Sequence, residues 1–218
     1  MAAAAASDPH HLGRSDEAVE GNAGSHGDGG PASTRIVVGY GFWIFLLSDI
    51  IMFSAFFAAY AVLSKQVAGG PTGRELFDLK NVGIETACLL LSSFSCGMAT
   101  VAAASKRLLL FHVTMAVTFV LGATFLGLEL VEFAGLIERG AGPDRSAFLS
   151  AFFALVGCHG LHIFVGLLWL LTMMAQVQAK GFREDIGRRI LCFSLFWHAL
   201  DIIWVALLTV VYLLGTMP

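Results

Sequence analysis

Residues 148–175 read FLSAFFALVGCHGLHIFVGLLWLLTMMA, and this run contains no Asp, Glu, Lys or Arg. An α-helix rises about 1.5 Å per residue, so about 20 apolar residues are enough to cross the hydrocarbon core of a bilayer. Inside lipid every backbone polar group needs a hydrogen-bond partner, and a helix provides all of them within one segment. The run therefore predicts a transmembrane helix that carries two histidines.

Four further apolar runs accompany this one, at approximately residues 41–64, 82–104, 109–134 and 190–215. The linkers between the runs hold residues that interrupt helices, among them Gly140 and the Gly-Pro-Asp sequence at 142–144. We therefore predict an all-α, polytopic membrane protein, in which residues 36–218 form a bundle of five transmembrane helices.

The composition agrees with this class of protein. Of the 218 residues, 57% are hydrophobic and 13% are charged, whereas soluble domains average about 45–50% and about 25%. The net charge of −3 offers no basic surface for nucleic acid. Residues 1–35 are rich in Ala, Gly and Ser and hold few large apolar side chains, so they are expected to form a disordered tail.

The distribution of Lys and Arg predicts the orientation, because cytoplasmic segments are enriched in both. The N-terminal tail, the second linker and the fourth linker together hold eight, and the segments on the opposite side hold five. The eight are Arg14, Arg35, Lys106, Arg107, Lys180, Arg183, Arg188 and Arg189. This difference places the N-terminus in the cytoplasm and the C-terminus in the periplasm of a bacterial inner membrane.

Several ionisable side chains fall inside the apolar runs, where they are costly and often functional. They are Asp49, Glu85, Glu129, Glu132, His159, His162, His198 and Asp201. Six of them form pairs three residues apart, and residues at this spacing share one face of a helix. Each pair should therefore face a neighbouring helix rather than lipid.

Two interpretations of these polar residues remain open on chemical grounds. They could form interhelical hydrogen bonds, each worth about 0.6–2 kcal/mol, or they could build a haem, metal or proton site. A di-iron bundle needs Glu-x-x-His on two helices, and no Glu here is followed by His at that spacing. The chain also has too few intramembrane histidines for the catalytic core of a terminal oxidase, so no metal or catalytic residue is predicted in it.

Several motifs, in order along the chain, resemble those of subunit III of the haem–copper respiratory oxidases. The first run begins Gly-Phe-Trp-Ile-Phe-Leu-Leu-Ser-Asp at 41–49, and the third ends with Glu129-x-x-Glu132-Phe133. The fourth holds His159-Gly-Leu-His162, and the fifth holds Trp-His-Ala-Leu-Asp at 197–201. The resemblance covers about residues 36–216. The five spans and the Asp at position 49 favour the quinol-oxidising, cytochrome bo branch, since cytochrome c oxidase relatives usually have seven spans and Glu there.

This resemblance implies a non-catalytic subunit with no cofactor of its own. Haem and copper would lie in the catalytic subunit I, with which this chain would assemble beside subunits II and IV. The family also implies bound phospholipid, support of assembly and proton uptake, and protection during turnover. The complex would oxidise ubiquinol, reduce oxygen to water and pump protons.

The resemblance also suggests a partner for the acid in the first span. Asp49 is expected to face the bundle interior and to pair with a histidine of the fourth span, His159 first and His162 second, with His198 as a competitor. Two other functions remain as alternatives to the oxidase subunit. They are a stand-alone proton-coupled transporter that uses these acids and histidines, and a haem-binding membrane anchor of a dehydrogenase.

Overall fold

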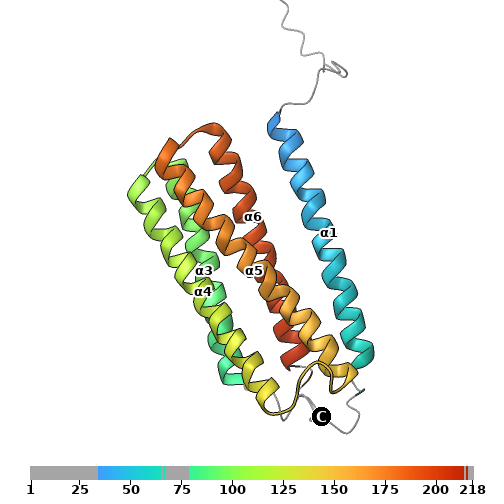
Figure 1. Ribbon diagram of the computed structural model, residues 1–218. Coiled ribbons are helices and arrows are strands. Elements are labelled where there is room, and N and C mark those ends of the chain that lie inside the picture. The colour runs from blue at the N-terminus through green and yellow to red at the C-terminus, as the bar shows by residue number, and fades with distance from the viewer. Residues whose placement is uncertain (1–33, 65, 67–78, 214, 216–218) are drawn as a thin grey trace, which may run out of the picture. The chain divides into compact units, whose positions relative to one another are not determined.

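Five long helices make up the computed structural model, which describes residues 34–64, 66, 79–213 and 215. They are α1 (Thr34–Leu63), α3 (Leu79–Ala104), α4 (Leu108–Glu138), α5 (Ala147–Lys180) and α6 (Glu184–Leu207). The last helix continues as one π-helical segment, η1 (Leu208–Leu213) (Figure 1). All five are long and apolar enough to cross a membrane, which confirms the predicted fold class. The predicted tail lies outside the described residues except for Thr34 and Arg35.

The helices extend beyond the apolar runs that predicted them. α1 begins at Thr34 rather than near 41, and α6 begins at Glu184 rather than near 190. α4 and α5 continue to Glu138 and Lys180, past the predicted ends near 134 and 175. Hydropathy marks only the part of a helix that lies in hydrocarbon, whereas the helix itself continues through the headgroup region on either side.

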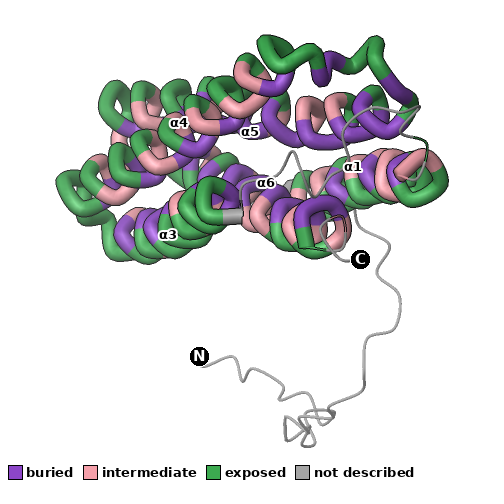
Figure 2. The backbone as a smooth tube through the Cα atoms, turned by 90° about the horizontal axis from the view of Figure 1, so that it is seen from below, coloured by how far each residue is buried: buried purple, intermediate pink, exposed green. Residues whose placement is uncertain are grey.

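Figure 2 shows the arrangement of the helices from below, in a view turned by 90° from that of Figure 1. α3 and α4 pack most extensively, α5 contacts α1, α4 and α6, and α6 contacts α3, α5 and α1. α1 lies at the edge, and only 11% of its most apolar stretch is buried, against 50% in α5 and α6. Most of the surface of α1 is therefore not covered by the other helices of this chain.

The packing of α6 depends on two tryptophans that are seven residues apart. The indole nitrogen of Trp197 donates to Ser92 Oγ at 3.0 Å, and that of Trp204 donates to Thr86 Oγ1 at 3.0 Å. Both acceptors lie on α3, which runs antiparallel to α6. A buried indole N–H normally needs such a partner, so these bonds fix the register of α6 on α3.

The connections on either side of α5 follow the usual chemistry of helix ends. Ser146 precedes α5 in extended conformation, and its side chain accepts a hydrogen bond from the backbone N–H of Leu149. This is the N-cap arrangement. Gly140 and Gly181 follow α4 and α5 with φ of 73° and 68°, values that glycine adopts without steric cost.

Candidate functional site

The ionisable residues expected from the sequence fall into three groups and one isolated histidine. Asp49 and His162 face each other across α1 and α5. Glu85, Glu129 and Glu132 gather where α4 meets α3 and α5, close enough for their charges to interact. The third group, His198 and Asp201, lies on α6 against α3. The structure therefore does not bring these residues into one site.

The Asp49–His162 pair lies near the middle of both helices. Asp49 Oδ2 is 4.0 Å from His162 Nε2, and the two side chains are 15% and 20% exposed. This distance is longer than a direct hydrogen bond. On its other side, His162 Nδ1 lies 2.7 Å from the carbonyl oxygen of Cys158. The aspartate therefore has a histidine beside it, across the interface that joins α1 to α5.

This geometry fixes which ring nitrogen of His162 bonds within α5. A carbonyl oxygen only accepts, so His162 Nδ1 must carry the hydrogen of its bond to Cys158. The facing Nε2 is directed toward the Asp49 carboxylate across 4.0 Å, so the two groups interact through space rather than by a direct hydrogen bond. A carboxyl group beside an imidazole is less costly inside the bilayer than an isolated one.

His159, which was expected to be the first partner of Asp49, has a different environment. It is completely buried, and neither of its ring nitrogens has a hydrogen-bond partner among the described residues. Its ring stacks on Trp204 with centroids 5.3 Å apart, and Phe125 meets it edge-on at 5.9 Å. The expected order was therefore wrong, because the rotation of α5 turns His159 into the aromatic core and His162 toward α1.

Two of the glutamates are almost fully buried. Glu85 is 1% exposed and Glu129 is 2% exposed. The Glu129 carboxylate lies against the backbone of α5 at Gly160, where a Cβ would come within 2.8 Å of both of its oxygens. Glu85 and Glu132 instead line a pocket of about 300 Å³ between α3 and α4, together with Asn81 and Arg139.

His198 and Asp201 share one face of α6, as their spacing predicts. His198 Nδ1 lies 2.8 Å from Ser93 Oγ on α3, and Ser93 also lies beside the Asp201 carboxylate. The three side chains line a shallow, open depression on the outer surface of α3 and α6, where both helices face away from the bundle. A polar group at mid-membrane on an outer surface is costly unless something covers it.

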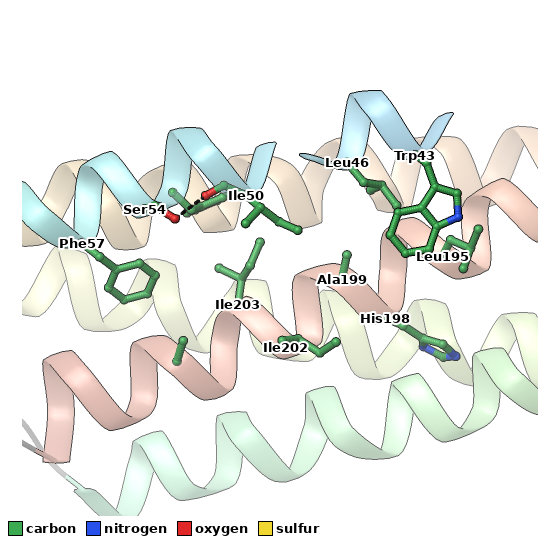
Figure 3. Close-up of a pocket in the computed structure, with 12 residues that line it drawn as sticks. Trp43, Leu46, Ile50, Ser54, Phe57, Leu195, His198, Ala199, Ile202 and Ile203 are labelled. Carbon is green, nitrogen blue, oxygen red and sulfur yellow. Dashed lines mark hydrogen bonds between the residues drawn. The ribbon is translucent and has the colours of Figure 1, made fainter. Parts of the chain in front are cut away.

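A largely apolar groove of about 460 Å³ runs between α1 and α6. Figure 3 shows Trp43, Leu46, Ile50 and Phe57 of α1 directed toward Ile203, Ala199 and Leu195 of α6. The hydroxyl of Ser54 donates to the carbonyl of Ile50 in its own helix, so it offers little polarity to the groove. This apolar lining would suit the hydrocarbon chain of a lipid.

Residues 16–216 match the sequence profile of the family described as cytochrome c oxidase subunit III. The chain belongs to this family. The match spans all five helices and includes each polar motif, which confirms the resemblance found in the sequence.

Curated relatives of this subunit III chain include both quinol and cytochrome c oxidase subunits. The "cytochrome bo(3) ubiquinol oxidase subunit 3" of Pseudomonas aeruginosa is 49% identical over 178 residues, which cover 82% of this chain and 85% of the relative. The "quinol oxidase subunit 3" of Bacillus subtilis is 40% identical over 80% of this chain and 86% of its own length. The "cytochrome c oxidase subunit 3" of a Bacillus species is 39% identical over 80% and 84%.

Some residues of these groups did not stand out in the sequence. Ser92, Ser93 and Thr86 become important only as the α3 partners of Trp197, His198 and Trp204. A serine or threonine inside a span commonly bonds to its own helix, so composition alone does not identify it as an interhelical partner. α3 and α6 run antiparallel, so residue numbers fall along α3 as they rise along α6. This pairing is the signal from which the α3 partners could have been predicted.

Proposed function

We propose that this chain is the non-catalytic subunit III of a proton-pumping haem–copper ubiquinol oxidase of the cytochrome bo type. The observation that carries the proposal is the 49% identity to a subunit of that name over most of both chains. The quinol-oxidase relative from Bacillus subtilis has a similar span, so the likeness extends across the whole membrane domain.

The distribution of potential ligands supports a subunit without its own redox centre. No group of three or more His, Cys, Asp or Glu side chains in the described part of the chain could hold a metal ion. His159, the most buried histidine, is enclosed by aromatic rings rather than directed at a second histidine. A haem–copper centre does not fit these residues, and haem and copper belong to the catalytic subunit I in this proposal.

The outer surfaces offer places for partner subunits. Ser93, His198 and Asp201 line a depression at mid-membrane on α3 and α6 together with apolar residues. Asp201 Oδ1 has no hydrogen-bond partner among the described residues, and lipid tails cannot supply one. A transmembrane helix of subunit I with a polar side chain at this depth would cover it. The exposed face of α1 is a second candidate surface, for subunit II or IV or for lipid.

The groove between α1 and α6 supports the proposal that the subunit binds phospholipid. Its lining is almost entirely apolar, and its volume of about 460 Å³ suits part of an acyl chain rather than water. A bound chain would fill the space between α6 and the loosely packed α1. In this way it would help to hold the Asp49–His162 pair together during turnover.

The experiment that tests the function is purification of the tagged chain from its native membrane in mild detergent. We expect a large haem-bearing subunit to co-purify, and the preparation to oxidise ubiquinol with reduction of oxygen. The chain separated from its partners should show no Soret band. A chain that purifies alone, or one whose own Soret band disappears on His159→Ala, would contradict the proposal.

A further inference from the structure

The pocket between α3 and α4 combines charges of both signs. Glu85 and Glu132 line one part of it, and Arg139 and Asn81 line another. Arg139 follows directly after the last residue of α4, and Asn81 lies in the first turn of α3, where the exposed N–H groups of the helix favour an anion. The pocket therefore has an acidic part and a part that attracts anions.

One oxygen in the acidic part has no hydrogen-bond partner. Glu85 is 1% exposed, and its Oε2 accepts no hydrogen bond from any described residue. A buried polar atom without a partner costs free energy, so a donor entering the pocket would be bound favourably. The volume of about 300 Å³ is about ten times the ~30 Å³ of one liquid water, which is more room than a single ion or water needs.

The depth of the pocket matches the polar surface of the membrane. α4 has 31 residues, a length of about 46 Å, whereas the hydrocarbon core is about 30 Å thick. About 8 Å therefore projects at each end. Glu132 lies six residues before the end of α4, and Glu85 lies six residues after the start of α3. Both are about 9 Å from their helix ends, which is close to the boundary of the hydrocarbon.

The pocket also opens toward lipid. Leu128 and Val131 line it beside the charged residues, and Val131 is 71% exposed on the outer face of α4. A ligand that fits all of these features has a cationic hydrogen-bond donor, an adjacent anionic group and an apolar part that continues along α4.

We propose that this pocket binds the phosphoethanolamine headgroup of a membrane phospholipid. The primary ammonium donates to Glu85 Oε2 and lies beside the Glu132 carboxylate. The phosphate accepts from the guanidinium of Arg139 and the amide of Asn81. The acyl chains follow Leu128 and Val131 into the bilayer. This site is separate from the α1–α6 groove, and it does not depend on which substrate the complex oxidises.

The test compares phosphatidylethanolamine with phosphatidylcholine, which has the same two charges but no N–H donor. The purified complex is delipidated, placed in mixed micelles of the two lipids at equal concentration, and analysed for retained lipid by native mass spectrometry. We expect retention to favour phosphatidylethanolamine. Glu85→Gln should reduce that preference about tenfold, the factor that corresponds to one charge-assisted hydrogen bond. Glu184→Gln, which removes an exposed carboxylate in the first turn of α6, should leave it unchanged.

Two further variants test the other parts of the site without altering a buried charge. Arg139→Gln should weaken retention of both lipids, whereas Arg107→Gln at the opposite end of α4 should not. Gly135 lines the pocket and has open space around it, so Gly135→Leu should block the pocket and remove the preference. Gly127→Leu is the matched control, because Gly127 also has open space but lies outside the pocket.

Several results would overturn the proposal. Equal retention of the two lipids by the unaltered complex would show that the N–H donors are not recognised. A preference that survives both Glu85→Gln and Gly135→Leu would place the lipid elsewhere. Full displacement of the lipid by soluble phosphoethanolamine would show that the acyl chains contribute nothing. Oxidase activity is measured on the same samples, so loss of the proposed function is distinguished from loss of this site.

Discussion

Several side chains in this bundle contact a residue on a neighbouring helix. His162 of α5 presents one ring nitrogen to Asp49 of α1. Trp197 donates to Ser92, and His198 contacts Ser93. Each contact is a small term, about 0.6–2 kcal/mol, but each joins helices that apolar packing alone would allow to slide.

Asp49→Asn tests the pair across α1 and α5. The amide keeps the size of the side chain and can donate to His162, but it cannot take up or release a proton. We expect the initial ubiquinol oxidase rate to be largely retained and inactivation during turnover to be about threefold faster, which corresponds to about 0.6 kcal/mol. Ser48→Ala is the control, since Ser48 bonds only within its own helix. Immediate loss of activity in an assembled complex would contradict this role.

Trp197→Phe tests the bond that fixes α6 on α3. The variant keeps an aromatic ring but leaves Ser92 without its donor, so thermal unfolding of the solubilised chain should show a loss of about 1–3 kcal/mol. Trp169→Phe is the control, because Trp169 packs its ring on Phe193 and Phe196, and it should cost less. A double-variant cycle with Ser92→Ala should give a coupling of about 0.6 kcal/mol. Additive effects would show that the bond contributes nothing.

At the scale of the helices, small residues decide how closely neighbours approach. Trp197 of α6 lies between α4 and α5, where a Cβ at Gly122 would be 3.0 Å from its ring and one at Gly166 would be 2.9 Å away. α1 has no comparable close contact at Gly39 or Gly41. The four helices α3 to α6 therefore form the tightly packed part of the bundle, and α1 is the helix most easily separated from it.

Gly166→Ala is expected to push Trp197 out of its position between α4 and α5. Overpacking of a dense core costs about 1–3 kcal/mol, and the loss should appear as a lower midpoint of thermal unfolding. Gly127→Ala, on the open side of α4, should be neutral or slightly stabilising, because alanine favours helix more than glycine does. Equal stability of the two variants would mean that α4, α5 and α6 adjust without cost.

At the scale of the whole molecule, five spans place the two ends of the membrane domain on opposite sides. The 8-to-5 distribution of Lys and Arg predicts that the N-terminus faces the cytoplasm. Alkaline phosphatase is active only in the periplasm, so a fusion at Pro218 should be active and one after Lys180 should not. The reverse pattern in stably inserted fusions would overturn the predicted orientation.

The sequence by itself determined the number and type of the helices. Transfer of a segment into lipid depends on the sum of its own residues, so the run at 148–175 predicts a span without knowledge of its neighbours. The linker was likewise predicted from nearby residues alone, at Gly140 and Gly142. α4 ends before these glycines and α5 begins after them. The family could be recognised from its motifs for the same reason, because each motif is a continuous stretch of chain.

Only the tertiary structure decided which residues meet. Two histidines three residues apart share a face, yet rotation of α5 by a fraction of a turn decides which of them reaches Asp49. The pocket that joins Glu85 to Arg139 depends on the register of α3 against α4. Helix rotation and register are set by side-chain packing summed over several helices. Hydropathy does not encode these interactions, because lipid and a neighbouring apolar helix are nearly equivalent surroundings for Leu, Ile and Phe.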